Sequence, residues 1–310
     1  MARPGFPKTL REFRRQFAEP PACLDYLWEC RWPDGFQCPR CRHPRAWRLK
    51  ERPVYECQAC GYQLSPTAGT VLHRSRFPLQ DWFWAAYLVA THTPGLSATQ
   101  LSRQMSCSYK TAWFLLHRLR RAMVSPVRSR LRGRVEVDET FIGGPAKGKH
   151  ARGVATHPNK SLVFGAVEVV EYVDAKGKRR ERAGRLRLRT TARADETSIR
   201  QFLETNVEPR TVVATDGWAG YSKSALVGFS HHPSLHLAVH IHRAFSNLKT
   251  WLAGTHHGVE PIYLQHYLDE FVFRFNRRQT PMAAFQSLLG IASSIQPCPA
   301  TQIRPPESTG

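Results

Sequence analysis

The chain has 310 residues, of which 42% are apolar, and 45 lysines and arginines against 24 aspartates and glutamates give it a net charge of +21. This length suits about two domains, and the apolar content argues against global disorder. So large a positive charge predicts a polyanionic partner, because each phosphate that a lysine or arginine neutralises releases counterions; we expect nucleic acid.

No segment reaches the ~18 consecutive apolar residues of a membrane helix, and the longest apolar run, 82–90, predicts a core helix. The N-terminus is basic but lacks the apolar stretch of a signal peptide. We therefore expect a cytoplasmic, nucleoid-associated protein with no membrane partner. In that reducing compartment, the eight cysteines are expected to be metal ligands or buried thiols.

Residues 20–66 contain two Cys-x-x-Cys pairs, separated by fifteen residues. The four cysteines are Cys38, Cys41, Cys57 and Cys60. Two pairs at this spacing are typical of a zinc ribbon. The predicted Zn²⁺ is structural, because four thiolates leave no open coordination position. Cys23 and Cys30 have no such spacing and are predicted to lie in the core of a preceding helix.

Residues 78–124 are predicted to form helices that end in a DNA-binding motif. Ser97 can cap a short helix over 98–104, and a turn near Ser106 leads to a second helix from Ser108. A short helix, a tight turn and a basic second helix indicate a helix-turn-helix, whose second helix enters the major groove. A plain helical hairpin gives the same pattern. The residues expected to contact DNA here are Lys110, Arg118, Arg120 and Arg121.

Residues 130–290 change to strands and later helices. Alternating or apolar runs at 135–143, 161–170 and 185–189 predict three strands, Asp195 opens a helix, and a short apolar strand ends in Asp216. Three strands, a helix, a strand and further helices is the order of the RNase H-like fold. We therefore expect an α/β, RNase H-like catalytic domain preceded by the zinc ribbon and the helix-turn-helix, with a loose tail over 291–310.

Asp138 and Asp216 fall on the first and fourth of these strands, which are neighbours in that fold. Two such carboxylates can hold two divalent cations about 3.5–4 Å apart for phosphoryl transfer, and oxygen ligands favour Mg²⁺ or Mn²⁺. The alternatives are an ion pair with an arginine for Asp138 and a turn position before Gly217 for Asp216. Three other acids are expected to support the site or face solvent: Glu136, Glu139 and Glu168.

A third metal ligand is expected on the helix over 240–254. His242 lies seven residues before Lys249, on one helix face, so a ligand and a phosphate-binding lysine could act together. Asn247 offers a carbonyl oxygen instead, and Glu270 is a downstream acid. The residues leave all three open. A basic run over 176–189 is expected to contact phosphates.

Five motifs, in order, resemble bacterial insertion-sequence transposases with an N-terminal zinc ribbon and a DDE-type RNase H-like domain, the ISXO-like group. They are CPRC with CQAC, VEVDETFIGG, TDGWAGY, HRAFSNLKTWLAGTHHG and YLDEFVFRFNRR, over about residues 20–285. The resemblance implies Mg²⁺-dependent cleavage at element ends and strand transfer into target DNA. Asp138 and Asp216 match the first two catalytic positions. Where many DDE enzymes have glutamate seven residues before a lysine or arginine, this chain has His242, and branches with asparagine as the third residue make Asn247 a candidate too.

The sequence therefore predicts an insertion-sequence DNA transposase. Its partners would be double-stranded DNA, as the terminal inverted repeats bound by the N-terminal modules and as the target. Holding two ends implies a homodimer or a larger assembly on DNA. Two other classes remain as alternatives: an RNase H-like nuclease without strand transfer, and a transposase-derived DNA-binding protein that is catalytically inactive.

Overall fold

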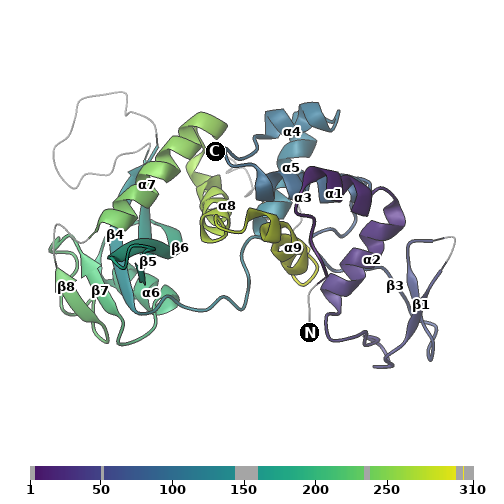
Figure 1. Ribbon diagram of the computed structural model, residues 1–310, viewed down its shortest axis with the longest axis horizontal. Coiled ribbons are helices and arrows are strands. Elements are labelled where there is room, and N and C mark those ends of the chain that lie inside the picture. Colours follow the sequence, from purple (N-terminus) through teal and green to yellow (C-terminus); the bar gives the residue numbers. More distant parts are fainter. Residues whose placement is uncertain (1–3, 50–51, 144–159, 234–237, 298–302, 304–310) are drawn as a thin grey trace, which may run out of the picture. The chain divides into compact units, whose positions relative to one another are not determined.

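The computed structural model divides the chain into two compact units (Figure 1). The first comprises residues 1–125 and 277–310, and the second comprises residues 126–276. The structure describes all residues except 1–3, 50–51, 144–159, 234–237, 298–302 and 304–310. Most of the predicted tail over 291–310 lies outside the described residues.

The first unit begins with helices α1 (Leu10–Gln16) and α2 (Pro20–Arg31) and a small antiparallel sheet of β1 (Ala46–Arg48), β2 (Tyr55–Cys57) and β3 (Gln63–Leu64). The sheet packs against α2, where Trp28 stacks on Tyr55 with ring centroids 3.9 Å apart. As predicted, Cys23 is buried in α2, whereas Cys30 is only half-buried. A three-stranded sheet this small has little apolar core of its own, so its stability depends on α2 and on its cysteines.

Four more helices belong to the described part of the first unit: α3 (Leu79–Thr91), α4 (Ala98–Gln104), α5 (Tyr109–Arg121) and α9 (Pro281–Ala292). The apolar run over 82–90 lies in α3, as predicted. Phe285 of α9 packs edge-on against Phe13 and Phe83, with ring centroids 5.8 and 5.9 Å away. The sequence had placed this helix in the catalytic domain by extending that domain to residue 290. The aromatic contacts assign it to the first unit instead.

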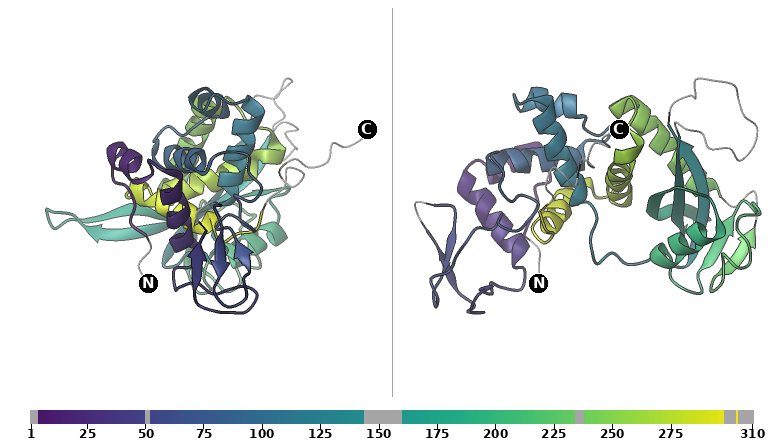
Figure 2. Two further views of the ribbon diagram at one scale, coloured as in Figure 1. Left: turned by 90° about the vertical axis from the view of Figure 1, so that its right-hand side faces the viewer. Right: turned by 180° about the vertical axis from the view of Figure 1, so that it is seen from behind.

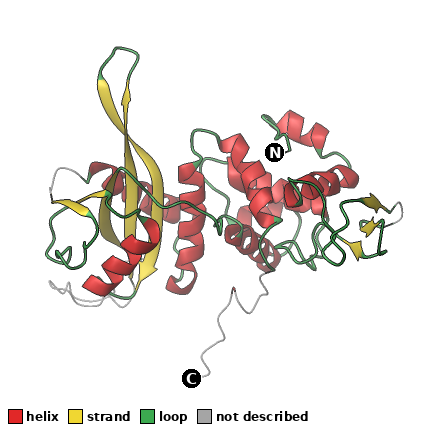
Figure 3. Cartoon of the chain, turned by 90° about the horizontal axis from the view of Figure 1, so that it is seen from below, coloured by secondary structure: helices red, strands yellow, loops and turns green. Residues whose placement is uncertain are grey.

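The second unit contains a five-stranded mixed sheet in the order β6-β5-β4-β7-β8 (Figures 1 and 3). The strands are β4 (Arg134–Ile142), β5 (Ser161–Val173), β6 (Arg179–Thr191), β7 (Val212–Thr215) and β8 (Ser230–Pro233). β4, β5 and β6 are antiparallel, whereas β7 runs parallel to β4 and β8 to β7. The first and fourth strands of the unit are therefore neighbours, as predicted. The sequence missed β8, because Ser-His-His-Pro has none of the β-branched or aromatic residues typical of strands.

Helices cover both faces of this sheet. On one face, α6 (Glu196–Asn206) packs against Val135 and Val137 of β4. On the other lie α7 (Val239–Trp251) and α8 (Leu264–Asn276), joined by a π-helical turn (Leu252–His256) and a 3₁₀ turn (Pro261–Tyr263). Because successive side chains of a strand alternate between faces, Glu136 and Asp138 point towards α7. Among the described residues, no helix combines the length and apolarity that crossing a membrane requires.

Candidate functional site

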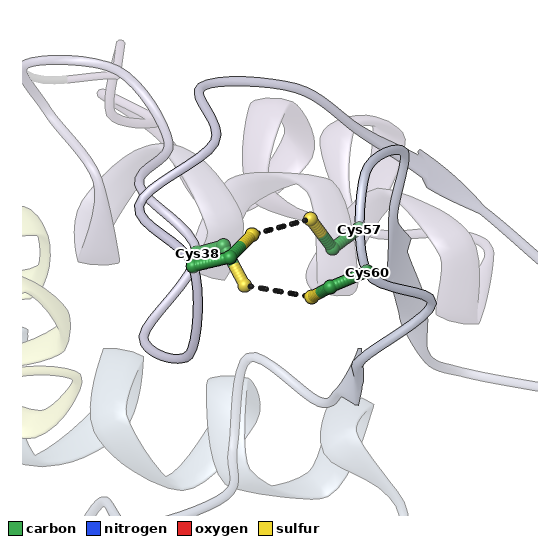
Figure 4. Close-up of side chains that lie close together, drawn as sticks. Cys38, Cys57 and Cys60 are labelled. Atoms are coloured by element: carbon green, nitrogen blue, oxygen red, sulfur yellow. Dashed lines mark hydrogen bonds between the residues drawn. The ribbon is translucent and has the colours of Figure 1, made fainter.

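Four cysteine thiols meet beside the small sheet, three of them labelled in Figure 4. Cys38 Sγ lies 3.7 Å from Cys60 Sγ, and Cys41 Sγ lies 3.5 Å from Cys57 Sγ. These separations exceed a disulfide bond of ~2.05 Å. They are close to the ~3.8 Å expected between thiolates arranged tetrahedrally at ~2.3 Å from zinc. The cluster fits a structural Zn²⁺ ion with these four ligands, as predicted.

The two cysteine pairs lie in matching backbone turns. Arg42 N donates to Cys38 O over 2.8 Å, and Gly61 N donates to Cys57 O over 3.1 Å. Arg42 and Gly61 have positive φ angles of 62° and 65°. This conformation suits glycine and costs an arginine roughly 1 kcal/mol or more. Each turn therefore places its two thiols through local structure alone.

Helices α4 and α5 begin at the residues that the sequence predicted. Ser97 Oγ accepts a hydrogen bond from Gln100 N over 3.1 Å, and Ser108 Oγ accepts one from Thr111 N over 3.2 Å. Ser106 in the turn between the helices has a φ of 48°. Each serine is an N-cap, so α4 ends at Gln104 and the Ser108 cap starts α5 at Tyr109 after a short turn, which produces a tight helical pair.

Two of the four basic residues predicted to contact DNA on α5 do not lie on its exposed surface. Arg120 is only 1% exposed. Arg118 donates to the His73 carbonyl oxygen over 2.6 Å, with its guanidinium 5.1 Å from the centre of the Trp82 ring. Arg120 is buried because α3, α4 and α9 all pack against α5 and cover more of it than one apolar stripe. Lys110 and Arg121 are exposed.

Asp138 lies in the middle of β4, 8% exposed and opposite Gly165 of β5. Its Oδ2 is 2.9 Å from His242 Nε2 on α7. Burial raises the pKa of Asp138 above its usual range; the nearby Asp216 carboxylate also acts to raise it, and His242 acts to lower it. The side chain that contacts Asp138 is a histidine, whereas the sequence had suggested an arginine as the alternative partner.

Asp216 follows directly after β7, the strand beside β4. Its Oδ1 accepts a hydrogen bond from Trp218 N over 2.9 Å, and Gly217 has a φ of 84°. Asp216 therefore opens a turn, which was the alternative role offered by the sequence. A metal role is compatible with that turn, because a carboxylate has about four lone-pair sites. Ala214 pairs with Glu136 of β4, so Asp216 follows two residues later beside Asp138, and its charge acts to raise the pKa of both Asp138 and Glu139.

Tyr221 connects the loop after β7 to β4. Its hydroxyl, in a side chain only 4% exposed, donates to Glu139 Oε2 over 2.7 Å. Burial raises the pKa of Glu139, and the charges of Asp138 and Asp216 add to the rise. Burial also raises the pKa of Tyr221, which keeps its hydroxyl protonated as the donor. The sequence gave this tyrosine no role; its place in the TDGWAGY motif was the available signal.

Glu136 caps α7 from the sheet, although the two are 104 residues apart along the chain. Glu136 Oε2 accepts from the backbone N–H groups of His240 and Ile241 over 2.7 and 2.9 Å. Glu136 Oε1 lies 2.8 Å from His240 Nδ1. Ala238, at the N-cap, makes no side-chain capping bond, so a buried carboxylate satisfies the first N–H groups of the helix. The solvent-facing role that the sequence allowed for Glu136 is wrong.

Gly165 lets α7 approach the sheet beside Asp138. A Cβ atom at this position would lie 2.6 Å from Phe245 Cζ and 2.8 Å from Ile241 Cδ1. Both side chains belong to the face of α7 that packs on β5. The absence of a side chain at Gly165 therefore contributes to the short distance between Asp138 and His242.

Glu168 has a structural position on β5. It is 7% exposed and accepts from the Arg185 guanidinium over 2.5 Å and from Arg132 N over 3.0 Å. Burial acts to raise the pKa of Glu168, but these hydrogen bonds outweigh it and lower the pKa below its usual range. The solvent-facing alternative for Glu168 is therefore wrong as well.

Of the three predicted third ligands, His242 is the one placed against Asp138 in the described part of the chain. Asn247 is exposed on α7, about 140° around the helix axis from His242. Glu270 is fully buried on α8, with Arg274 Nη1 3.8 Å from its Oε1. Lys249 is exposed on the same side of α7 as His242. The geometry favours His242.

Two family profiles match the chain. The ISXO2-like transposase domain matches residues 130–276, and the transposase zinc-ribbon domain matches residues 21–63. An uncharacterized protein in transposable element ISH50 of Halobacterium salinarum is 27% identical over 217 residues, which cover 67% of this chain and 70% of that protein. No solved structure matches significantly.

Proposed function

We propose that this chain, which belongs to the insertion-sequence transposases with an ISXO2-like transposase domain and a transposase zinc ribbon, is a DNA transposase. It cuts and joins DNA strands at a site formed by Asp138, Asp216 and His242. One observation supports these residues above all. Asp138 on β4 contacts His242 on α7, and Asp216 directly follows β7, the strand beside β4, although 78 residues separate the two aspartates in the chain.

The topology of the second unit supports an RNase H-like fold. Its three antiparallel strands are followed by two strands parallel to the first, in the order β6-β5-β4-β7-β8. In the parallel pair of β4 and β7, Glu136 is opposite Ala214, so Asp138 and Asp216 follow at corresponding positions. This arrangement suits a catalytic site on β4 and at the end of β7.

The two carboxylates of the donor set fit Mg²⁺ or Mn²⁺, because these cations prefer oxygen ligands, whereas the imidazole of His242 is a ligand more typical of softer metals. The raised pKa of Asp138 agrees with such a site. Burial and a second acid both oppose the ionisation of this carboxylate, so a nearby cation would stabilise its ionised form strongly. When bound, two such ions activate the attacking water or 3′-hydroxyl and stabilise the leaving oxygen.

The protein's own residues supply the positioning on which phosphoryl transfer chiefly depends. Glu136 holds the start of α7, and with it His242, against β4. Tyr221 holds the loop of Asp216 against Glu139. Lys249, on the same side of α7 as His242, would bind a phosphate of the DNA backbone.

The first unit would bind the terminal inverted repeats. In this proposal α4 and α5 act as a helix-turn-helix, with Lys110 and Arg121 as exposed phosphate contacts, and the zinc ribbon adds a second contact. The net charge of +21 agrees with an extended DNA partner. Two element ends must be held together, so a homodimer or a larger assembly would form on DNA.

The test is cleavage of a labelled duplex containing the terminal repeat of the element, with Mg²⁺ present. Asp138→Asn and Asp216→Asn should each lower the cleavage rate at least about a thousandfold and leave duplex affinity within about twofold. Glu204→Gln, which removes an exposed acid on α6, should change neither.

Cleavage by either aspartate variant at the wild-type rate would refute the site. Wild-type protein that binds ends but never cuts them would be the inactive DNA-binding protein. Wild-type protein that cuts without joining would be the nuclease.

A further inference from the structure

The hairpin of β5 and β6 extends past the rest of its sheet (Figures 2 and 3). β4 pairs with β5 only from Ser161 to Val169, whereas β6 pairs with β5 as far as Val173. Residues 170–182, here called the arm, therefore form a ribbon of two strands and a turn. Apart from half-buried Val170 and Asp174, every residue of the arm is exposed. The arm has no apolar core of its own, so packing does not explain its length.

The pairing register gives the arm two chemically different faces. Paired residues of antiparallel strands lie on the same face. Tyr172 pairs with Arg180, and Val170 with Arg182, so the paired strand residues of this face are two arginines, an exposed tyrosine and a valine. The turn residue Asp174 contacts Arg180. The opposite face contains the pairs Glu171 with Glu181 and Val173 with Arg179. We call the first the basic face.

Two of the three acids of the arm are neutralised within the protein. Asp174 Oδ1 accepts from Lys176 N and Lys178 N, both over 2.9 Å, which closes the turn, and its Oδ2 accepts from Arg180 Nε over 3.1 Å. Glu181, at the base, is 2.5 Å from Arg134. These contacts order the tip and attach the base to β4. Lys176, Lys178 and Arg182 are exposed.

We propose that the arm is a DNA-contacting ribbon whose basic face lies in a groove of the duplex, away from the bond that is cut. The chemistry of the face fits this partner: arginine binds phosphates and the edges of guanine, and a two-stranded ribbon fits the major groove. The inference depends on the proposed function only for the position of the cut.

The sheet predicts where this contact falls. Gly165 is opposite Asp138, and Val173 at the end of the ribbon is eight residues further along β5. At ~3.3 Å per residue, the arm reaches about 26 Å from Asp138. Duplex DNA rises about 3.4 Å per base pair, so the contact is expected within about eight base pairs of the cut.

The experiment compares two double variants of the full chain on the same end duplex, without Mg²⁺ so that no cleavage occurs. Tyr172→Ala with Arg182→Ala removes one aromatic ring and one charge from the basic face. Val173→Ala with Arg179→Ala is the matched control, because it removes one apolar side chain and one charge from the opposite face. All four side chains are exposed, so both variants should fold, and circular dichroism checks this.

The basic-face variant should bind about tenfold more weakly, with a salt dependence reduced by about one phosphate contact. It should also lose hydroxyl-radical protection within about eight base pairs of the cut. The control should keep that protection and bind within about threefold of wild type. Equal losses in both variants, or none in either, would overturn the proposal.

The basic-face variant could instead keep its DNA affinity and lose self-association, which sedimentation measures. That result would show that the arm pairs copies of the chain, and it would overturn the proposal too. Failure of the catalytic proposal gives a different pattern. The footprint of the arm would then persist although Asp138→Asn has no effect on cleavage.

Discussion

The cysteine cluster and the acidic site are both candidate metal centres, but they are built in opposite ways. Each Cys-x-x-Cys pair lies within one backbone turn, and the four thiols are all within 4.8 Å of one another. The acidic site combines Asp138 from β4, Asp216 from the end of β7 and His242 from α7. It depends on sheet pairing, on the packing of a helix at Gly165 and on the cap that Glu136 supplies.

Under the proposed function, this difference separates a metal that stabilises the fold from a metal that would take part in catalysis. A closed four-thiolate site has no position for a substrate, and its binding energy stabilises the fold. The acidic site is held by the surrounding sheet, and burial raises the pKa values of Asp138 and Glu139, so in the proposed function these carboxylates would gain from a nearby cation. Loss of a ligand should therefore unfold the ribbon in one case and remove only chemistry in the other.

The largest expected effect is on the ribbon. Cys57→Ser should abolish zinc binding and unfold β1 to β3, because a structural zinc ion contributes about 10–16 kcal/mol, more than a small sheet can replace. Zinc content and the NMR dispersion of the ribbon measure this. Cys107→Ser, a half-buried cysteine outside the cluster, is the control and should keep full zinc. A Cys57→Ser protein with one bound zinc and a folded ribbon would contradict the comparison.

A smaller effect is expected at Glu136, where the acidic site depends on a distant cap. Glu136→Gln replaces a charged acceptor of two backbone N–H groups, and should destabilise the second unit by about 1–3 kcal/mol. Because His242 would lose its fixed position, kcat for end cleavage should fall about tenfold with KM for DNA nearly unchanged. Glu204→Gln is the control for removing a carboxylate. Wild-type kcat in a folded Glu136→Gln protein would show that the cap has no positioning role.

The parts that local spacing determines could be predicted from the sequence. The cysteine pairs, the Ser97 and Ser108 caps, and the strand order that makes β4 and β7 neighbours all follow from patterns within a few residues or from element order. The placement of Asp138 and Asp216 on or directly after neighbouring strands followed from that order.

Features that depend on long-range packing could not be predicted. The hydrogen bonds between Glu136 and the start of α7 join residues that are 104 positions apart, and no sequence pattern near Glu136 indicates this contact. Arg120 looked exposed because periodicity describes one buried stripe, whereas three helices pack on α5. The arm looked like a charge run, because alternating charges on an exposed ribbon lack the apolar period of a strand.

The central claim is that Asp138, Asp216 and His242 form one divalent cation site. Titration of the zinc-loaded full chain with Mn²⁺, followed by the loss of the free Mn²⁺ electron paramagnetic resonance signal, tests it without any requirement for activity. Asp138→Asn and Asp216→Asn should remove specific binding, His242→Ala should weaken it about tenfold or more, and Asn247→Ala should leave it unchanged. Wild-type Mn²⁺ affinity in the aspartate variants, or weakening by Asn247→Ala with none by His242→Ala, would contradict this assignment.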